Sequence, residues 1–283
     1  MNEKNMAASD VSSEKKLIRI AAIVEYNGAS FHGWQRQKHH DNPTIQAALE
    51  RAISKVANHP IDIVCAGRTD AGVHASTQVI HFDTHAARKD YGWMLGINSN
   101  LPEGIAVRNV QFISSDFHAR FTATARRYRY LIYNKKIRQA LFANQLTWHK
   151  HQLDEQKMHE AVQHLIGEHD FSSFRARDCQ SNTPNRNIHS ASVKRYGDIV
   201  MLEVQANAFL YHMIRNIVGV LLPIGEGKQS PGWAKWVLEQ ADRTKAGITA
   251  PSEGLYFVGV EYPDEFNIPS KPWGPVFVEP WLV

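Results

Sequence analysis

The sequence predicts an α+β fold made of two similar α/β units. The antiparallel or mixed sheets of these units are expected to join into one extended sheet, with helices on one side and an active-site cleft between the units. Strand patterns are connected by short hairpins and by helices in no strict alternation, which favours this class. The pattern of elements also begins again near residue 117, and 283 residues are enough for two domains of ordinary size.

The first unit is expected at residues 17–115. It opens with an apolar strand at 17–28 that ends at Asn27-Gly28, a strong turn signal. Thr44 then begins a helix whose apolar side chains recur with the 3.6-residue period of an amphipathic helix. The other expected elements are strands at 61–67 and 77–84, a helix at 88–98 and a strand at 105–113.

The second unit is expected at residues 116–263. The stretch "ARRYRYLIYN" has a strand period that places Tyr128, Tyr130 and Ile132 on one face. The alternating residues on the other face are Arg127, Arg129 and Leu131. The other expected elements are a helix at 154–167 with Asp154 as its N-cap, a hairpin turning at 196–198, helices at 208–225 and 232–241, and a strand at 254–263.

The two ends of the chain differ in character from the units. Residues 1–16 are polar and lack the apolar core of a secretory signal, so we expect a short disordered tail. Residues 264–283 are rich in proline and are expected to lie extended over the body. No stretch approaches the about 18 consecutive apolar residues of a transmembrane helix. Two cysteines, Cys65 and Cys179, fit a reducing compartment, so a cytoplasmic location is expected.

The net charge of +4 is modest, but the charges are unevenly distributed. From Phe117 to Leu153 there is no Asp or Glu. The basic residues of this segment are Arg120, Arg126, Arg127, Arg129, Lys135, Lys136, Arg138 and Lys150. Phenylalanine and tyrosine are interleaved with them, a mixture that nucleic acids favour. The segment is either a solvated basic surface or a phosphate-binding stripe, and both interpretations stay open.

Several kinds of site are excluded because their sequence motifs are absent or incomplete. The stretch "GEGK" at 225–228 lacks the first glycine and the Ser or Thr of a P-loop, and it follows a helix instead of opening one. No HExxH pair and no CxxC pair occurs, so no metal site is expected. Neither a G-x-S-x-G elbow nor a dinucleotide-binding glycine motif is found.

The stretch "CAGRTDAGVHA", residues 65–75, places two charges at the end of an apolar run. Asp70 followed by Gly72 is typical of a turn in which the carboxylate bonds its own backbone. Alternatively Asp70 is catalytic, as a nucleophile or as a stabiliser of a cationic sugar, and must stay ionised in a partly dry cleft. Arg68 would face the same side of an extended segment and would favour that ionised form.

Seven stretches carry a resemblance to one family. They are "AGRTDAGVHA", "FHGWQRQ", "TIQAALERA", "FHARFTATARRYRYLIYN", "DFSSFRA", "FLYHMIRNIVG" and "EGLYFVGVEYP". From about Leu17 to Pro263 the chain resembles the tRNA pseudouridine synthase A (TruA) family, with the motifs in order and at the expected distances. The combination of "GRTDAGVHA", "RRYRY" and "MIRNIVG" is the most specific part.

The resemblance implies an isomerase that converts uridine to pseudouridine at positions 38, 39 and 40 of the tRNA anticodon stem-loop, after flipping the base. It implies no cofactor, because one bond to C1′ is broken and another is made without redox change. It also implies a homodimer in which each tRNA bridges both subunits.

By the same resemblance, Asp70 is the essential residue, which attacks the sugar or base covalently or stabilises a glycal-like intermediate. Tyr128 would stack on the uracil near C5, and Arg215 would pair with Asp70. The residues also allow plainer roles, with Tyr128 as a core aromatic and Arg215 as a snorkelling side chain on an apolar helix. A lone arginine among buried helix positions nevertheless needs an anion.

Three further residues are expected to contact RNA under this resemblance. Arg68 would enter the space that the flipped nucleotide leaves. Arg88 is placed to meet a backbone phosphate. Gln78 is also expected to touch RNA.

Two other functions compete with the isomerase. One is a hydrolase of N-ribosyl bonds, in which Asp70 and a second carboxylate such as Asp83 form an acid–nucleophile pair. The other is a non-catalytic RNA-binding module that uses Tyr128 and Tyr130 as stacking rings. The Arg68–Asp70–Gly72 loop argues against mere binding, which does not require it.

Overall fold

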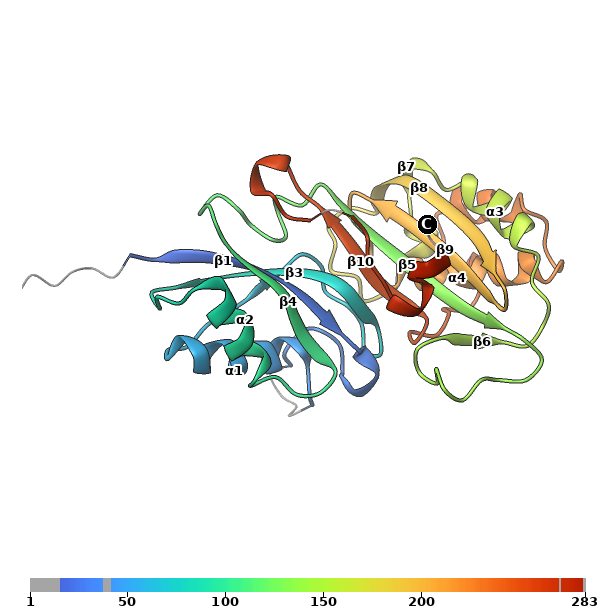
Figure 1. Ribbon diagram of the computed structural model, residues 1–283. Coiled ribbons are helices and arrows are strands. Elements are labelled where there is room, and N and C mark those ends of the chain that lie inside the picture. The colour runs from blue at the N-terminus through green and yellow to red at the C-terminus, as the bar shows by residue number, and fades with distance from the viewer. Residues whose placement is uncertain (1–15, 38–41, 270, 282–283) are drawn as a thin grey trace, which may run out of the picture.

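The computed structural model describes residues 16–37, 42–269 and 271–281 (Figure 1). The N-terminal half contains β1 (Ile18–Tyr26), α1 (Ile45–Ala57), β2 (Val64–Cys65), β3 (His74–Thr84), α2 (Asp90–Asn98) and β4 (Ile105–Ile113). The C-terminal half contains β5 (Ala125–Asn134), β6 (Thr147–His149), α3 (Glu155–Gln163), β7 (Gly167–Asp170), β8 (Asn185–Tyr196), β9 (Ile199–Ala206), α4 (Met213–Gly225), α5 (Trp233–Glu239) and β10 (Leu255–Glu261). Short 3₁₀ helices lie at Gly28–Ser30, Ser172–Phe174, Arg243–Lys245, Asp264–Phe266 and Val276–Trp281.

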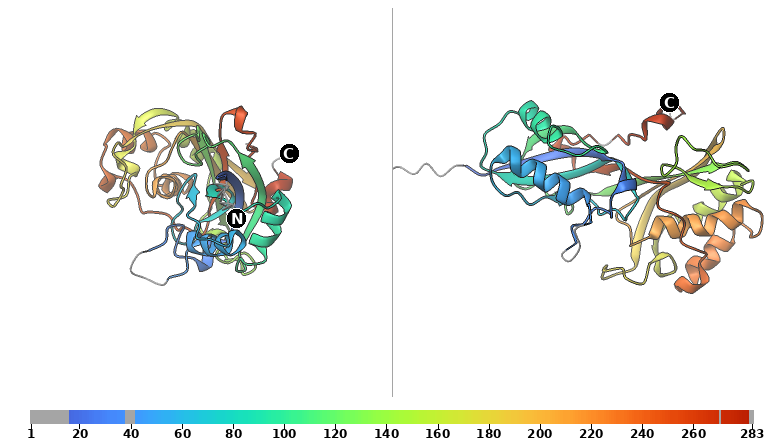
Figure 2. Two further views of the ribbon diagram at one scale, coloured as in Figure 1. Left: turned by 90° about the vertical axis from the view of Figure 1, so that its left-hand side faces the viewer. Right: turned by 90° about the horizontal axis from the view of Figure 1, so that it is seen from below.

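These strands form one sheet in the order β4-β1-β3-β10-β5-β9-β8-β7, with β2 beside β3 and β6 beside β5. Most neighbours are antiparallel, whereas β10 runs parallel to β3 and β6 runs parallel to β5. The predicted α+β class with one extended mixed sheet is therefore confirmed. The two halves follow one another along the length of this sheet (Figure 2).

The two halves of the sheet meet where β10 lies between β3 and β5. Only Tyr256 and Phe257 of β10 pair with β3, opposite His74 and Ala75, whereas β10 pairs with β5 over most of its length. We propose that the units 17–115 and 116–263 are separate domains, because so few pairs join them. The junction lies at the beginning of β3, directly after the stretch that contains Asp70.

Each face of the sheet has its own hydrophobic core. The larger core contains residues of α1 to α4 together with Tyr128, Tyr130 and Ile132 of β5. The smaller core lies on the opposite face and contains Leu131. The predicted alternation of β5 is therefore confirmed. In the described part of the chain, no helix is long and apolar enough to cross a membrane.

Residues 264–281, here called the C-terminal strap, contact both halves of the molecule. On the N-terminal half, Gln111 donates to the carbonyl of Phe266 at 3.0 Å, and the Arg108 guanidinium lies 4.9 Å from the centre of the Trp273 ring. On the C-terminal half, Arg129 donates to the carbonyl of Gly274 at 2.6 Å. The described part of the strap thus contacts both halves, and it contains two short 3₁₀ helices where an extended segment was expected.

Some details differ from the predictions, and one expectation falls almost wholly outside the described residues. The helix expected at 208–225 begins at Met213, because His212 has a left-handed backbone with φ of 60° and ends the preceding loop. The strand expected at 61–67 is reduced to the two residues of β2. The tail expected at 1–16 lies, apart from its last residue, outside the described residues.

Candidate active site

Asp70 lies in a tight turn between β2 and β3. The backbone N–H of Val73 donates to the Asp70 carbonyl at 3.2 Å, and Gly72 has φ of +79°, a conformation that favours glycine. Beneath the turn, the hydroxyls of Tyr26 and Thr69 share a hydrogen bond of 2.8 Å. The predicted turn is therefore present, but its hydrogen bond is made by the Asp70 carbonyl, and the carboxylate contacts Arg215 and His212 instead of its own backbone.

The stretch "FHGWQRQ" supports this turn from the side. The backbone N–H of Trp34 donates to the carbonyl of Thr69 at 3.0 Å. Gly33 has φ of +85°, and a Cβ there would lie 3.0 Å from the Thr69 carbonyl oxygen and 3.1 Å from the Ala71 nitrogen. Only glycine allows the two backbones to approach so closely, which gives this motif a structural reason.

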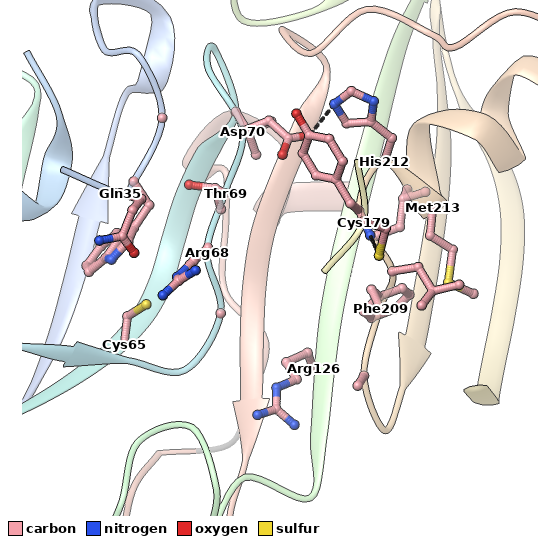
Figure 3. Close-up of a pocket in the computed structure, with 18 of the residues that line it drawn as sticks. Gln35, Cys65, Arg68, Thr69, Asp70, Arg126, Cys179, Phe209, His212 and Met213 are labelled. Atoms are coloured by element: carbon pink, nitrogen blue, oxygen red, sulfur yellow. Dashed lines mark hydrogen bonds and ion pairs between the residues drawn. The ribbon is translucent and has the colours of Figure 1, made fainter. Parts of the chain in front are cut away.

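The Asp70 carboxylate lies close to nitrogens of two side chains of the C-terminal half, Arg215 and His212, and Figure 3 shows the contact with His212. Arg215 Nη1 and His212 Nε2 each lie 3.3 Å from the same oxygen, Oδ2. Arg215 is fixed independently, because its Nε donates to the carbonyl of Ala250 at 2.8 Å. The side chain of Asp70 keeps 20% of its surface exposed, so it is held without being sealed off.

His212 is a site residue that the sequence reading missed. It precedes Arg215 by three residues in "YHMIRN", a spacing that could have suggested a shared target. Burial lowers the pKa of His212; the Asp70 carboxylate acts in the opposite direction, and the Arg215 guanidinium lowers it again. The imidazole is therefore neutral near pH 7. The ring of Tyr211 stacks on it, with centroids 3.9 Å apart.

Tyr128 reaches the same cleft from β5. Its ring packs edge-on against Phe209, with centroids 5.1 Å apart, and lies 4.7 Å from the ring of Phe257. Burial raises the pKa of the phenol, and Tyr26 and Asp70 nearby raise it further. Tyr128 is thus both a core aromatic and a cleft residue, with a phenol that stays protonated at neutral pH.

A cleft of about 1040 Å³ lies between the two halves and collects these groups. Arg68, Asp70, Tyr128 and Arg215 all line it, as the predicted convergence requires. In Figure 3, Asp70 and His212 point toward each other, whereas Arg68 points elsewhere in the cleft. The cation paired with Asp70 is Arg215, as the family resemblance implies, and not Arg68, which its spacing from Asp70 suggested.

The basic segment 117–153 divides between two faces. Arg126 lines the cleft, but its terminal nitrogens donate to the carbonyls of Ala66, Arg120, Ala123 and Asn207. Arg127 and Arg129 lie on the opposite face of β5 and pair with Glu203 at 2.7 Å. A continuous phosphate-binding stripe is therefore not formed, because alternate residues of a strand face opposite sides.

Two expected RNA contacts lie away from the cleft opening. Gln78 is fully buried, and its side-chain nitrogen donates to the carbonyl of Gly67 at 2.6 Å. Because it exposes no surface, the expectation that Gln78 touches RNA is wrong, and the residue instead supports the loop beside Arg68. Arg88 is exposed but follows the far end of β3 and is absent from the residues that line the cleft.

The described residues contain no group of three or more His, Cys, Asp or Glu side chains that could hold a metal ion. Asp83, the second carboxylate of the hydrolase hypothesis, pairs with Arg19 at 2.7 Å near the far end of β3. It does not line the cleft that contains Asp70. Asp70 is thus the carboxylate that contacts Arg215 and His212 in this cleft, which Asp178 also lines and Asp83 does not.

Comparison with known proteins agrees with this geometry. A family model described as tRNA pseudouridine synthase matches residues 22–122 and 161–263. These ranges include the Asp70 turn, α4 and β10. The chain belongs to the tRNA pseudouridine synthase family. The predicted resemblance is confirmed.

Individual relatives extend the match over most of the chain. A protein of Histophilus somni (strain 129Pt) named tRNA pseudouridine synthase A is 56% identical over 92% of this chain and 96% of its own. Proteins of the same name from Aliivibrio salmonicida and Vibrio parahaemolyticus are 54% and 52% identical. Each of these two matches covers 92% of this chain, with 99% and 98% of the relative.

Proposed function

We propose that this protein is a tRNA pseudouridine synthase. The bond between N1 and C1′ of a uridine breaks, a bond between C5 and C1′ forms, the C5 proton leaves and N1 gains a proton. Because the electrons balance, the reaction needs no cofactor or metal. The observation that carries the proposal is the Asp70 carboxylate, held by Arg215 and His212 in a cleft between two halves of a family member.

Asp70 is the group proposed to act on the nucleotide. It attacks the sugar or the base, or it stabilises a glycal-like intermediate, and the geometry fits each route. Tyr128 receives the flipped uracil at the cleft wall, and Arg68, exposed in the cleft, fills the gap in the stem. Flipping costs a few kcal/mol, and stacking on a ring contributes about 1–3 kcal/mol per base.

The proposed substrate is the tRNA anticodon stem-loop, with uridines at positions 38, 39 and 40 as targets. Support comes from the family and from relatives named tRNA pseudouridine synthase A. A homodimer and a cytoplasmic location are also proposed. Exposed arginines at the cleft, such as Arg68 and Arg120, would contact phosphates, so binding should weaken steeply with salt.

The test is tritium release from unmodified tRNA that carries C5-tritiated uridine. Wild type should release tritium, and Asp70→Ala should release none. Replacing uridines 38, 39 and 40 by cytidine should remove the signal. Dialysis against a chelator should leave the rate unchanged. Equal release by wild type and Asp70→Ala would refute the proposal.

The same assay separates the competing functions. A hydrolase would yield free uracil and an abasic RNA, and would need a second acid. Asp83→Asn is a matched control, because the amide can still accept from Arg19; the isomerase should keep its rate, whereas the proposed hydrolase should lose it. A binding module would bind tRNA and release no tritium.

A further inference from the structure

Both nitrogen donors at Asp70 approach one and the same oxygen. Arg215 Nη1 and His212 Nε2 lie 3.3 Å from Oδ2. Within the described residues, no hydrogen bond or ion pair is directed at Oδ1. The carboxylate is therefore asymmetric, with one oxygen held by the protein and the other left toward the cleft.

The position of His212 is imposed by the backbone. It is the residue before α4 and has φ of 60° and ψ of 7°, the left-handed region that side-chain-bearing residues seldom adopt. Its carbonyl accepts from the N–H of Asn216 at 2.9 Å, which anchors it to the first turn of the helix. Backbone strain of this kind persists where the surroundings fix it, and it gathers at functional sites.

The surroundings of His212 also determine which of its two ring nitrogens carries the hydrogen. A carboxylate only accepts hydrogen bonds, so the nitrogen that faces Asp70 must carry the hydrogen. Burial lowers the pKa of the imidazole below its ordinary value, and Arg215 and Arg243 lower it further, whereas Asp178, like Asp70, acts in the opposite direction. A neutral ring that contacts Oδ2 at 3.3 Å through this nitrogen does not add a second full positive charge beside Arg215.

We propose that His212 is a positioning residue for Asp70. Its neutral Nε2–H and the Arg215 guanidinium together hold Oδ2, so that Oδ1 is the oxygen presented to the flipped nucleotide. The contact of 3.3 Å is long, as such contacts often are before substrate binds, and it shortens in the complex. The proposal rests on the proposed function, since it concerns how the same carboxylate is aimed.

The test uses two substitutions that are matched in size and in backbone strain. His212→Gln places an amide N–H where Nε2 lies, and His212→Leu has a similar volume and no donor. Single-turnover tritium release by the leucine variant should fall by about 10²-fold, the order expected from misplacing a reacting group by an ångström. The glutamine variant should recover most of that loss. Dissociation constants for tRNA should change less than threefold in both.

Three outcomes would overturn the proposal. The leucine variant could keep the wild-type rate, the glutamine variant could be as slow as leucine while equally folded, or both could lose tRNA binding instead of rate. Should the leucine variant fail to fold, His212→Asn serves in its place, because its amide is one methylene too short to reach Oδ2. Asparagine should then be slow and glutamine fast.

These outcomes are distinct from failure of the proposed function. If wild type itself releases no tritium, the proposed function fails, whatever His212 does. If wild type is active and the glutamine and leucine variants do not differ, only the role of His212 is wrong. The oxygen assignment is checked by a structure of the enzyme with tRNA that carries 5-fluorouridine, in which Oδ1 should be the atom nearest the nucleotide and Oδ2 should still contact His212.

Discussion

Two arginine–carboxylate sites lie on opposite sides of this molecule. They differ in the distance between the charged groups and in the number of carboxylate oxygens that are engaged. On the face under the C-terminal strap, Glu203 accepts from Arg127 and Arg129, each at 2.7 Å, and Arg129 is almost fully buried. At the cleft, Asp70 meets Arg215 at 3.3 Å, and only one of its oxygens is engaged. The same pair of chemical groups is saturated at one site and left partly available at the other.

The difference separates a stabilising site from a reactive one. A carboxylate with short bonds to two guanidiniums has little freedom to meet a ligand, and removing it takes away a charged partner that both arginines share. A carboxylate with a free oxygen in an open cleft contributes less to folding but can act on a substrate. The substitutions below should therefore affect rate at the Asp70 site and stability at the Glu203 site.

Apart from changes to Asp70 itself, the largest effect is expected from Arg215→Lys. Lysine cannot bond both the Ala250 carbonyl and Asp70 as the guanidinium does, so the single-turnover rate should fall by about 10²- to 10³-fold. Rates measured with saturating tRNA test this. Arg108→Lys, which changes an exposed arginine on β4, serves as the control and should keep the wild-type rate. Equal rates for both variants would show that Arg215 has no role in the reaction at Asp70.

Glu203→Gln should act on stability instead. Arg127 and Arg129 lose the carboxylate that they share, although Arg127 keeps Glu261 at 3.9 Å, and the free energy of unfolding should fall by about 2 kcal/mol. Denaturant titration measures this. Glu239→Gln breaks an exposed pair with Lys235 on α5 and should cost less than about 0.5 kcal/mol. At a temperature where both are folded, the rate of each variant should be close to that of wild type.

The Glu203 site also predicts how stability depends on pH. Burial alone would raise the pKa of Glu203, but the hydrogen bonds and charges of Arg129 and Arg127 bring it below the ordinary value of 4.5. Because the folded pKa is the lower one, the stabilisation is present above pH 4.5 and is lost as the pH falls through the folded pKa. Wild type should therefore lose more stability than Glu203→Gln on acidification. Thermal melts from about pH 3 to about pH 6, the range of carboxyl titration, measure this loss. Parallel curves would contradict this.

The smallest effect is expected far from both sites. Arg88 is exposed beyond the end of β3, and as a phosphate contact it would affect binding alone. Arg88→Ala should weaken tRNA binding by a few-fold and lower the salt slope of the dissociation constant by about one, without changing the single-turnover rate. An unchanged salt slope would show that Arg88 does not meet RNA.

Local patterns in the sequence were enough for the α+β class and the alternation of β5, whereas the shared cleft of Asp70, Tyr128 and Arg215 was implied by the family resemblance. They were insufficient where partners come from distant segments. Gln78 reads as a polar strand residue, but its partner is the backbone of Gly67 in a neighbouring loop, so it is buried. His212 was missed because its left-handed conformation, which ends the loop and starts α4 late, depends on packing and not on local propensity.

One measurement tests the central claim most directly, namely that Asp70 acts on the nucleotide while Glu203 only stabilises the fold. Single-turnover pseudouridine formation is compared for Asp70→Asn and Glu203→Gln, each saturated with tRNA and fully folded. Asp70→Asn should lose about 10⁴-fold or more in rate, with its thermal midpoint and tRNA affinity near those of wild type. Glu203→Gln should keep the wild-type rate. If Asp70→Asn stays within tenfold of wild type, or if Glu203→Gln is slowed equally, the account is contradicted.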